Sequence, residues 1–161
     1  MTIEANIDLI QSFWQASERG DIDEMTALWA PDAINHGGQT AQGQRQPPVG
    51  PEGLKRVFSS LLRTFPDRKY LIEDILATGD KIVCRLTVSG THQGVPELPV
   101  EGGMLMAVPP TGKAYTTQQI HIFRVKHGKI AEHWAVRDDL GMMQQLGIVA
   151  IAGQTASASR Q

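Results

Sequence analysis

Apolar residues recur every three or four positions along three stretches of the chain, which predicts three helices. The first covers residues 3–20, and the third covers 54–65 and ends before Pro66. The second is short and begins at Asp21, which with Glu24 resembles a capping box. The intervening stretch is rich in proline and glycine, and within it only residues 33–36 read as a short extended piece.

After the third helix the pattern changes to the alternation and β-branched composition of strands. Four strand-like runs follow, at residues 70–77, 81–90, 113–125 and 129–136. A short helix, DLGMMQQLG, ends the patterned part of the chain. Helices before strands predict an α+β fold in which the N-terminal helices pack over one face of an antiparallel sheet.

Two segments do not fit this pattern. Residues 94–112 form a loop with an apolar centre at 104–108, which is typical of a lid or a packing arm. Residues 151–161 are small and polar, and we expect a flexible tail there. Residues 1–150 have the length of a single domain.

Composition limits the classes of partner. The chain has 161 residues, of which 41% are hydrophobic and 20% charged, as in ordinary globular proteins. The net charge of -2 provides no basic field, so we expect no nucleic-acid partner. We find no export signal and no apolar run near the ~20 residues of a membrane helix. The single Cys84 excludes an internal disulfide, and we expect a cytoplasmic protein.

The last two strands form a hairpin, residues 118–139, that holds most of the candidate chemistry. Its turn length decides which side chains share a face of the sheet. A two-residue loop pairs Val125 with Ile130 and places His121 opposite Trp134.

A three-residue loop with Gly128 in the left-handed conformation pairs Val125 with Lys129 instead. We favour this register, which places His121 opposite His133. The face toward the helices then carries Gln119, His121 and His133, with Gln119 opposite Ala135. The other face carries the apolar residues Ile120, Ile122, Ile130 and Trp134.

Several motifs in order, NHGG, GTHQG, PPTGK and HGKIAEHWAVRDDLGMMQQLG, resemble the SnoaL-like polyketide cyclase family of the nuclear transport factor 2-like superfamily. The resemblance covers about residues 3–147. It implies a cone-shaped α+β barrel with an internal ligand cavity, often a homodimer through the sheet. It also implies a cofactor-independent aldol cyclase in which an aspartate removes an activated C–H proton from a polyketide ester.

By the same resemblance, Gln119 and His121 lie on the cavity wall, and His36 also contributes to it. The family's catalytic aspartate falls on Ala135, which has no proton to transfer, so the mechanism cannot carry over unchanged. Trp14 reads as core from its helical spacing, and it is also a candidate substrate-binding residue.

Three residues remain as candidate catalytic groups. His121 has the titration range of a general base or acid, and its alternative is a hydrogen-bonded pocket wall. His133 joins it only if the three-residue loop is correct. Asp138 is either a displaced carboxylate for the missing aspartate or a cap for the last helix, a role that Asp139 shares.

The histidines show none of the usual metal-binding spacings, so we expect no metal and no cofactor. We favour a cyclase-like enzyme acting on a small hydrophobic carbonyl compound. The alternative is a binding protein that keeps the fold and holds such a molecule without chemistry. The apolar outer face of the sheet predicts a homodimer.

Overall fold

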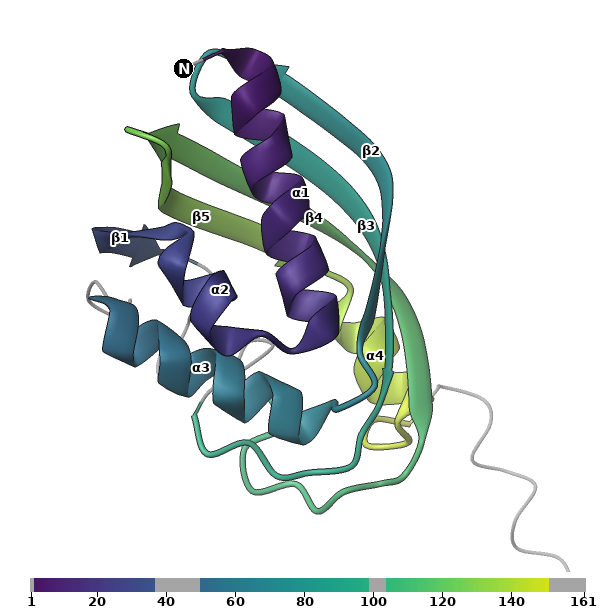
Figure 1. Ribbon diagram of the computed structural model, residues 1–161. Coiled ribbons are helices and arrows are strands. Elements are labelled where there is room, and N and C mark those ends of the chain that lie inside the picture. Colours follow the sequence, from purple (N-terminus) through teal and green to yellow (C-terminus); the bar gives the residue numbers. More distant parts are fainter. Residues whose placement is uncertain (1, 37–49, 99–103, 151–161) are drawn as a thin grey trace, which may run out of the picture.

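The computed structural model describes residues 2–36, 50–98 and 104–150, and the predicted tail at 151–161 lies outside these ranges. Figure 1 shows the arrangement of the elements. In chain order they are α1 (Ile3–Arg19), α2 (Ile22–Ala27), β1 (Trp29–Asn35), α3 (Gly50–Thr64), β2 (Lys69–Thr78), β3 (Lys81–Thr91), β4 (Ala114–Lys126), β5 (Lys129–Arg137) and α4 (Asp139–Gln145). The predicted helices and the four predicted strands are therefore confirmed.

The five strands form one curved sheet in the order β1-β5-β4-β3-β2, and its edges do not close on each other. Strands β2 to β5 are antiparallel neighbours, whereas β1 runs parallel to β5. The α+β fold is confirmed, with the correction that the sheet is mixed. Strand β1 begins at Trp29, two residues after the end of α2. Proline at position 31 is compatible with this edge strand.

The N-terminal helices cover one face of the sheet, and α1 crosses its concave side (Figure 1). The core is centred on Phe13 of α1, which packs against aromatic rings from both layers. Its ring centroid lies 5.1 Å from that of Trp14, 5.9 Å from Trp29, 6.0 Å from Phe58 and 5.8 Å from Phe123. Burial of such large rings is the main stabilising contribution of the helix-to-sheet contact.

The predicted three-residue hairpin loop is wrong. His127 and Gly128 both have left-handed backbones, with φ of 50° and 74°, and Lys126 pairs with Lys129. Two consecutive positive φ angles make the two-residue turn whose twist fits a hairpin. The sequence argument gave the left-handed position to glycine alone, but histidine is among the residues that also adopt it.

A β-bulge then shifts the register of the hairpin by one further residue. Val125 pairs with Ile130, but Arg124 pairs with Glu132, so Ala131 is the extra residue. Ile130 consequently faces the core and is fully buried, contrary to the predicted outer position.

Beyond the bulge, His121 lies opposite Ala135, not opposite His133 or Trp134. His133 instead lies opposite Phe123, one position along the same face. The two histidines are therefore diagonal neighbours on the concave side of the sheet.

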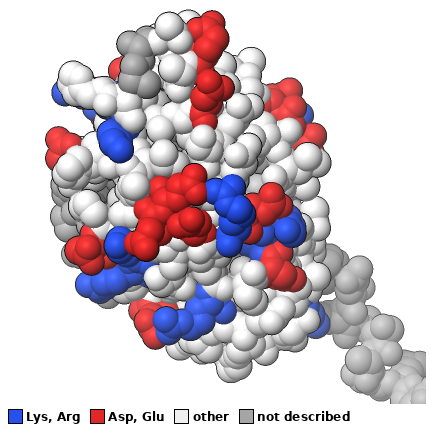
Figure 2. All heavy atoms as spheres, in the orientation of Figure 1, with Lys and Arg blue, Asp and Glu red and all other residues white. Residues whose placement is uncertain are grey.

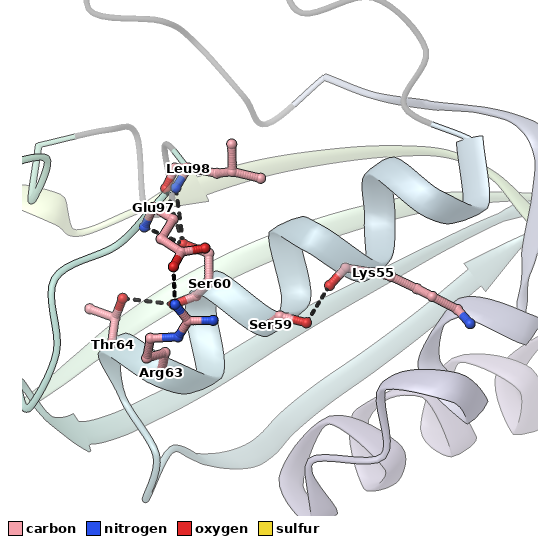
Figure 3. Close-up of polar contacts among 7 residues, drawn as sticks. All are labelled: Lys55, Ser59, Ser60, Arg63, Thr64, Glu97 and Leu98. Carbon is pink, nitrogen blue, oxygen red and sulfur yellow. Dashed lines mark hydrogen bonds and ion pairs between the residues drawn. The ribbon is translucent and has the colours of Figure 1, made fainter.

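The segment after β3 is fastened to α3 (Figure 3). The Ser60 hydroxyl accepts hydrogen bonds from the backbone N–H groups of Glu97 (3.0 Å) and Leu98 (3.1 Å). Arg63 adds an ion pair with Glu97. Within the apolar segment 104–108, Leu105 is fully buried, so this segment packs on the protein's own core.

Charges on the face shown in Figure 2 occur in mixed acidic and basic groups. Ion pairs between exposed side chains include Lys55 with Asp23 (2.8 Å) and Arg19 with Glu24 (2.5 Å). Across the described ranges, none of the helices is both long and apolar enough to cross a membrane.

Candidate functional site

Four polar side chains form a continuous hydrogen-bonded chain on the concave face of the sheet. Gln119 Oε1 lies 2.9 Å from His121 Nε2, and His121 Nδ1 lies 2.8 Å from His133 Nε2. His133 Nδ1 in turn lies 3.0 Å from Asn35 Oδ1. All four ring nitrogens of the pair of histidines are therefore engaged. Below, these four residues are called the relay.

Three strands position the relay. Asn35 is the Cα partner of His133 in the parallel β1–β5 ladder, and Gln119 and His121 are two residues apart on β4. Side chains two apart on a strand share a face. The sequence analysis missed Asn35, because its partner is set by parallel pairing to a distant strand. The available signal was its place in an extended run beside His36.

Aromatic rings enclose the pair of histidines. The Trp14 ring meets His121 edge-on with centroids 4.9 Å apart. Phe123 lies against His133 with centroids 4.8 Å apart, and Trp29 meets His133 edge-on at 5.9 Å. The planes of the two imidazoles differ by only 14°, which suits an in-plane contact between ring nitrogens. Both imidazoles are therefore in direct contact with aromatic rings.

Burial keeps both imidazoles neutral at pH 7. It lowers the pKa of His121 well below its ordinary value, and the nearby His133, Arg68 and Arg137 act in the same direction. Burial likewise lowers the pKa of His133 to about 3, with Arg137 and His36 contributing. A neutral imidazole is the form that can accept a proton.

Two guanidinium groups lie near the pair. Arg68 is 4% exposed and packs over two rings, with its Cζ 5.7 Å from the Phe65 centroid and 5.2 Å from that of Tyr70. Arg137 contacts the carboxylate of Asp139 at 3.2 and 3.4 Å. Both guanidinium groups act to lower the pKa of His121, and the charge of Arg137 is at the same time paired with the Asp139 carboxylate.

His36 lies on the opposite face of the sheet from the relay. Its Nε2 is 2.9 Å from Glu132 Oε2, and its ring stacks on Trp134 with centroids 4.6 Å apart. Glu132 also pairs with Arg124. His36 follows Asn35 directly, so the alternation of the strand sends the two side chains to opposite faces.

Ala135 and Asp138 differ in their placement. Ala135 lies directly across from His121 and is partly exposed. Asp138 is exposed and is the N-cap of α4, because its Oδ1 accepts a hydrogen bond from the Gly141 N–H at 2.8 Å. The expected cap is thus confirmed for Asp138, whereas Asp139 pairs with Arg137.

The remaining candidates are structural. His92 is buried, and its Nδ1 accepts a hydrogen bond from the Thr111 N–H at 3.3 Å, which ties the end of β3 to the segment before β4. Burial raises the pKa of the Cys84 thiol to about 11, which leaves it protonated and unreactive. Among the residues that the structure describes, no three His, Cys, Asp or Glu side chains group as metal ligands would.

The curved sheet, with helices over a concave face that carries the relay, defines a cone-shaped α+β fold. The sequence model of the SnoaL-like polyketide cyclases matches residues 8–146. The chain therefore belongs to the SnoaL-like polyketide cyclase family, as the motifs predicted.

Relatives and solved structures agree with this assignment. The chain is 26% identical over 146 residues to the aklanonic acid methyl ester cyclase DnrD of Streptomyces peucetius, covering 90% of this chain and 92% of that protein. It is 27% identical over 138 residues to the nogalonic acid methyl ester cyclase of Streptomyces nogalater, covering 82% and 90%. The crystal structure of wild-type IdmH from Streptomyces antibioticus has a TM-score of 0.70 and 32% identity, covering 88% and 98%. The expectation of a cyclase-like enzyme is consistent with these relatives.

Proposed function

We propose that the protein is a polyketide cyclase-type enzyme that closes a ring in a small hydrophobic carbonyl compound by an intramolecular aldol reaction. One observation carries the proposal: two neutral, hydrogen-bonded histidines, His121 and His133, lie on the concave face beneath the helices. The curated relatives DnrD and the S. nogalater protein are methyl ester cyclases, which supports an ester of this kind as the substrate class.

The reaction balances without a co-reactant. A base takes the acidic proton between two carbonyl groups, and the electron pair of the broken C–H bond becomes an enolate. The enolate carbon attacks a ketone carbon of the same molecule, which forms the C–C bond and leaves an alkoxide. A proton returned to the alkoxide completes an isomerisation.

The pair of histidines supplies the base and the returning acid. Each neutral imidazole can accept a proton only from a C–H group that two carbonyl groups make acidic. The lowered pKa then makes the protonated ring a strong acid that returns the proton to the alkoxide. The positive charges of Arg68 and Arg137 stabilise the enolate and the alkoxide as they form. Trp14 contributes apolar wall beside His121, so the substrate's rings bind where water is excluded.

In this proposal Ala135 stands at the position of the family's catalytic aspartate. Its Cα is paired with that of His121, so an aspartate there would reach the same space. The histidines on β4 and β5 therefore act as the base in place of the missing carboxylate. The substitution Ala135→Asp therefore adds a second base to a site that already has one.

The test is deuterium exchange at the acidic C–H of a polycyclic β-keto ester, followed by NMR. We expect the natural protein to accelerate exchange and the double variant His121→Gln/His133→Gln to lose at least ten-fold of that acceleration. Asp138→Asn keeps the helix cap and removes the carboxylate, so we expect its rate to be unchanged.

Two results would count against the proposal. Exchange by Ala135→Asp alone, with none by the natural protein, would mean that the chain is a binding protein on this fold. Loss of exchange in Asp138→Asn, with the histidine variants still active, would identify Asp138 as the base.

A further inference from the structure

A count of protons shows that the relay cannot be symmetric. It has three contacts, Gln119–His121, His121–His133 and His133–Asn35, and each contact needs one hydrogen. Two neutral imidazoles supply only two N–H groups. The third hydrogen must come from one terminal amide, because an amide turned by 180° presents N–H₂ in place of oxygen.

A neutral relay therefore has two states. In one, both rings carry the proton on Nε2: His121 donates to Gln119, His133 donates to His121, and Asn35 donates to His133. In the other, both rings carry it on Nδ1: His133 donates to Asn35, His121 donates to His133, and Gln119 donates to His121. In each state, one terminal ring nitrogen donates to its amide and the other terminal ring nitrogen accepts from its amide.

We propose that the relay is a bifunctional proton wire, in which one histidine takes a proton at one end while the other gives a proton at the opposite end. Asn35 and Gln119 are its positioning residues, because the orientation of each amide selects the state. The inference rests on the proposed cyclase function, which needs a base for the C–H group and an acid for the alkoxide in a single cycle.

The transfer is balanced at each atom. In the Nε2 state, the substrate replaces the Asn35 N–H₂ group at His133 Nδ1, the ring nitrogen that carries no hydrogen, and its C–H proton moves to this nitrogen. The Nε2 proton of His133 moves 2.8 Å to His121 Nδ1, and the Nε2 proton of His121 passes to the alkoxide. The pair ends neutral in the Nδ1 state. Release of the His133 Nδ1 proton to water, uptake of one proton from water at His121 Nε2 and rotation of both amides restore the Nε2 state.

The charged groups near the relay favour transfer of a proton through the pair over a histidine that stays protonated. Arg68 and Arg137 lie near the pair, and His36 adds to the field at His133. A lasting imidazolium would be repelled by these groups, whereas a proton that enters at one end and leaves at the other adds no net charge.

The test uses two isosteric variants of the full chain. A carboxylate only accepts hydrogen bonds, so Asn35→Asp requires the Nδ1 state and Gln119→Glu requires the Nε2 state. Ring ¹⁵N chemical shifts report the tautomer of each histidine in the ligand-free protein. We expect His121 and His133 both to carry Nδ1–H in the first variant and both to carry Nε2–H in the second.

The distant ring is the decisive readout. In Asn35→Asp, Nδ1–H on His133 together with Nε2–H on His121 would mean a local electrostatic effect and would overturn the proposal. In the double variant both ends accept, so three ring protons are needed, and we expect a cationic pair that persists at least one pH unit higher than in either single variant. If one of the single variants does not fold, the other must still show the same tautomer on both histidines.

The catalytic part is tested separately. With the β-keto ester as probe, both single variants should lose kcat for ring closure by ten-fold or more, because each holds the wire in one state. If the two single variants show opposite tautomers but the natural protein does not catalyse deuterium exchange, the cyclase function is refuted and the coupling of the two histidines is retained. If the natural protein catalyses exchange but each variant changes only the nearer histidine, the cyclase function is retained and the proton wire is refuted.

Discussion

The two neutral histidines of the relay make the stability of the protein depend on pH. His121 and His133 have folded-state pKa values below the ordinary 6.5, so the unfolded chain binds protons that the folded chain does not. Their contribution to stability is therefore complete above about pH 6.5 and is lost as the pH falls toward 3. Each such proton changes the free energy of unfolding by about 1.4 kcal/mol per pH unit.

We predict that urea unfolding between pH 7 and pH 4.5 shows this slope and that His133→Gln reduces it. Glutamine keeps a hydrogen-bonding side chain and does not titrate. The control is His127→Gln at the exposed tip of the hairpin, which should retain the natural slope. An unchanged slope in His133→Gln would mean that this histidine is not held neutral by the fold.

A second prediction at the residue scale concerns the α4 cap. Asp138→Ala leaves the Gly141 N–H without its acceptor and should lower the free energy of unfolding by about 1 kcal/mol. Asp138→Asn can still accept this hydrogen bond, so its midpoint in urea should stay near that of the natural protein. Equal losses in both variants would show that charge, not capping, is what the position supplies.

At the scale of elements, the contact between α3 and the segment after β3 depends on a glycine. A Cβ on Gly94 would lie 2.2 Å from the carbonyl oxygen of Arg63, whereas one on Gly90 would have only ordinary contacts, the nearest at 3.5 Å. The Gly94 N–H also donates to the Thr64 carbonyl at 3.3 Å. Only glycine allows this close approach of two backbones.

We predict that Gly94→Ala lowers the free energy of unfolding by about 1–3 kcal/mol, the usual cost of overpacking, while Gly90→Ala changes it by much less. Thermal and urea unfolding of the two variants would measure the difference. Similar behaviour of both would mean that the segment moves away from α3 without loss.

The hairpin turn and the β-bulge together determine the register of β5 against β4. The two-residue turn at His127 and Gly128 alone would place His121 opposite Trp134, and the extra Ala131 restores Ala135 to that position. The bulge therefore keeps His133 on the concave face beside His121. Removing one residue at this point would turn every later side chain of β5 to the other face.

The whole molecule has an apolar outer sheet face that we propose joins two copies. Val136 is 74% exposed and Ile120 is 44% exposed, and they are paired across β4 and β5. Leu76, Val83, Ile122 and Trp134 form an outward row across four strands by their register. Such a continuous apolar face is typical of an association surface.

We predict that the natural protein is a dimer by light scattering at micromolar concentration and that Val136→Arg makes it a monomer. Because Val136 is exposed, the substitution should leave the fold intact. Leu140→Arg is the matched control, since Leu140 is 60% exposed but lies on α4. A monomeric natural protein, or dimers in both variants, would contradict the proposed surface.

The sequence by itself determined the elements and the family. Helical and alternating patterns identify α1, α3 and β2 to β5 because those periods follow from local geometry and one buried face. The ordered motifs around GTHQG and HGKIAEHW were enough to identify the SnoaL-like family. Gln119 and His121 could be selected because they are two apart on one predicted strand.

Only the tertiary structure decided which groups meet. Asn35 reaches His133 through the parallel pairing of β1 and β5, strands that are distant in the sequence, so no local pattern indicates it. The hairpin register depended on a left-handed His127 and a bulge at Ala131, two small backbone choices that change every later partner. Strand pairing is a long-range property, because its free energy comes from contacts that local periodicity does not encode.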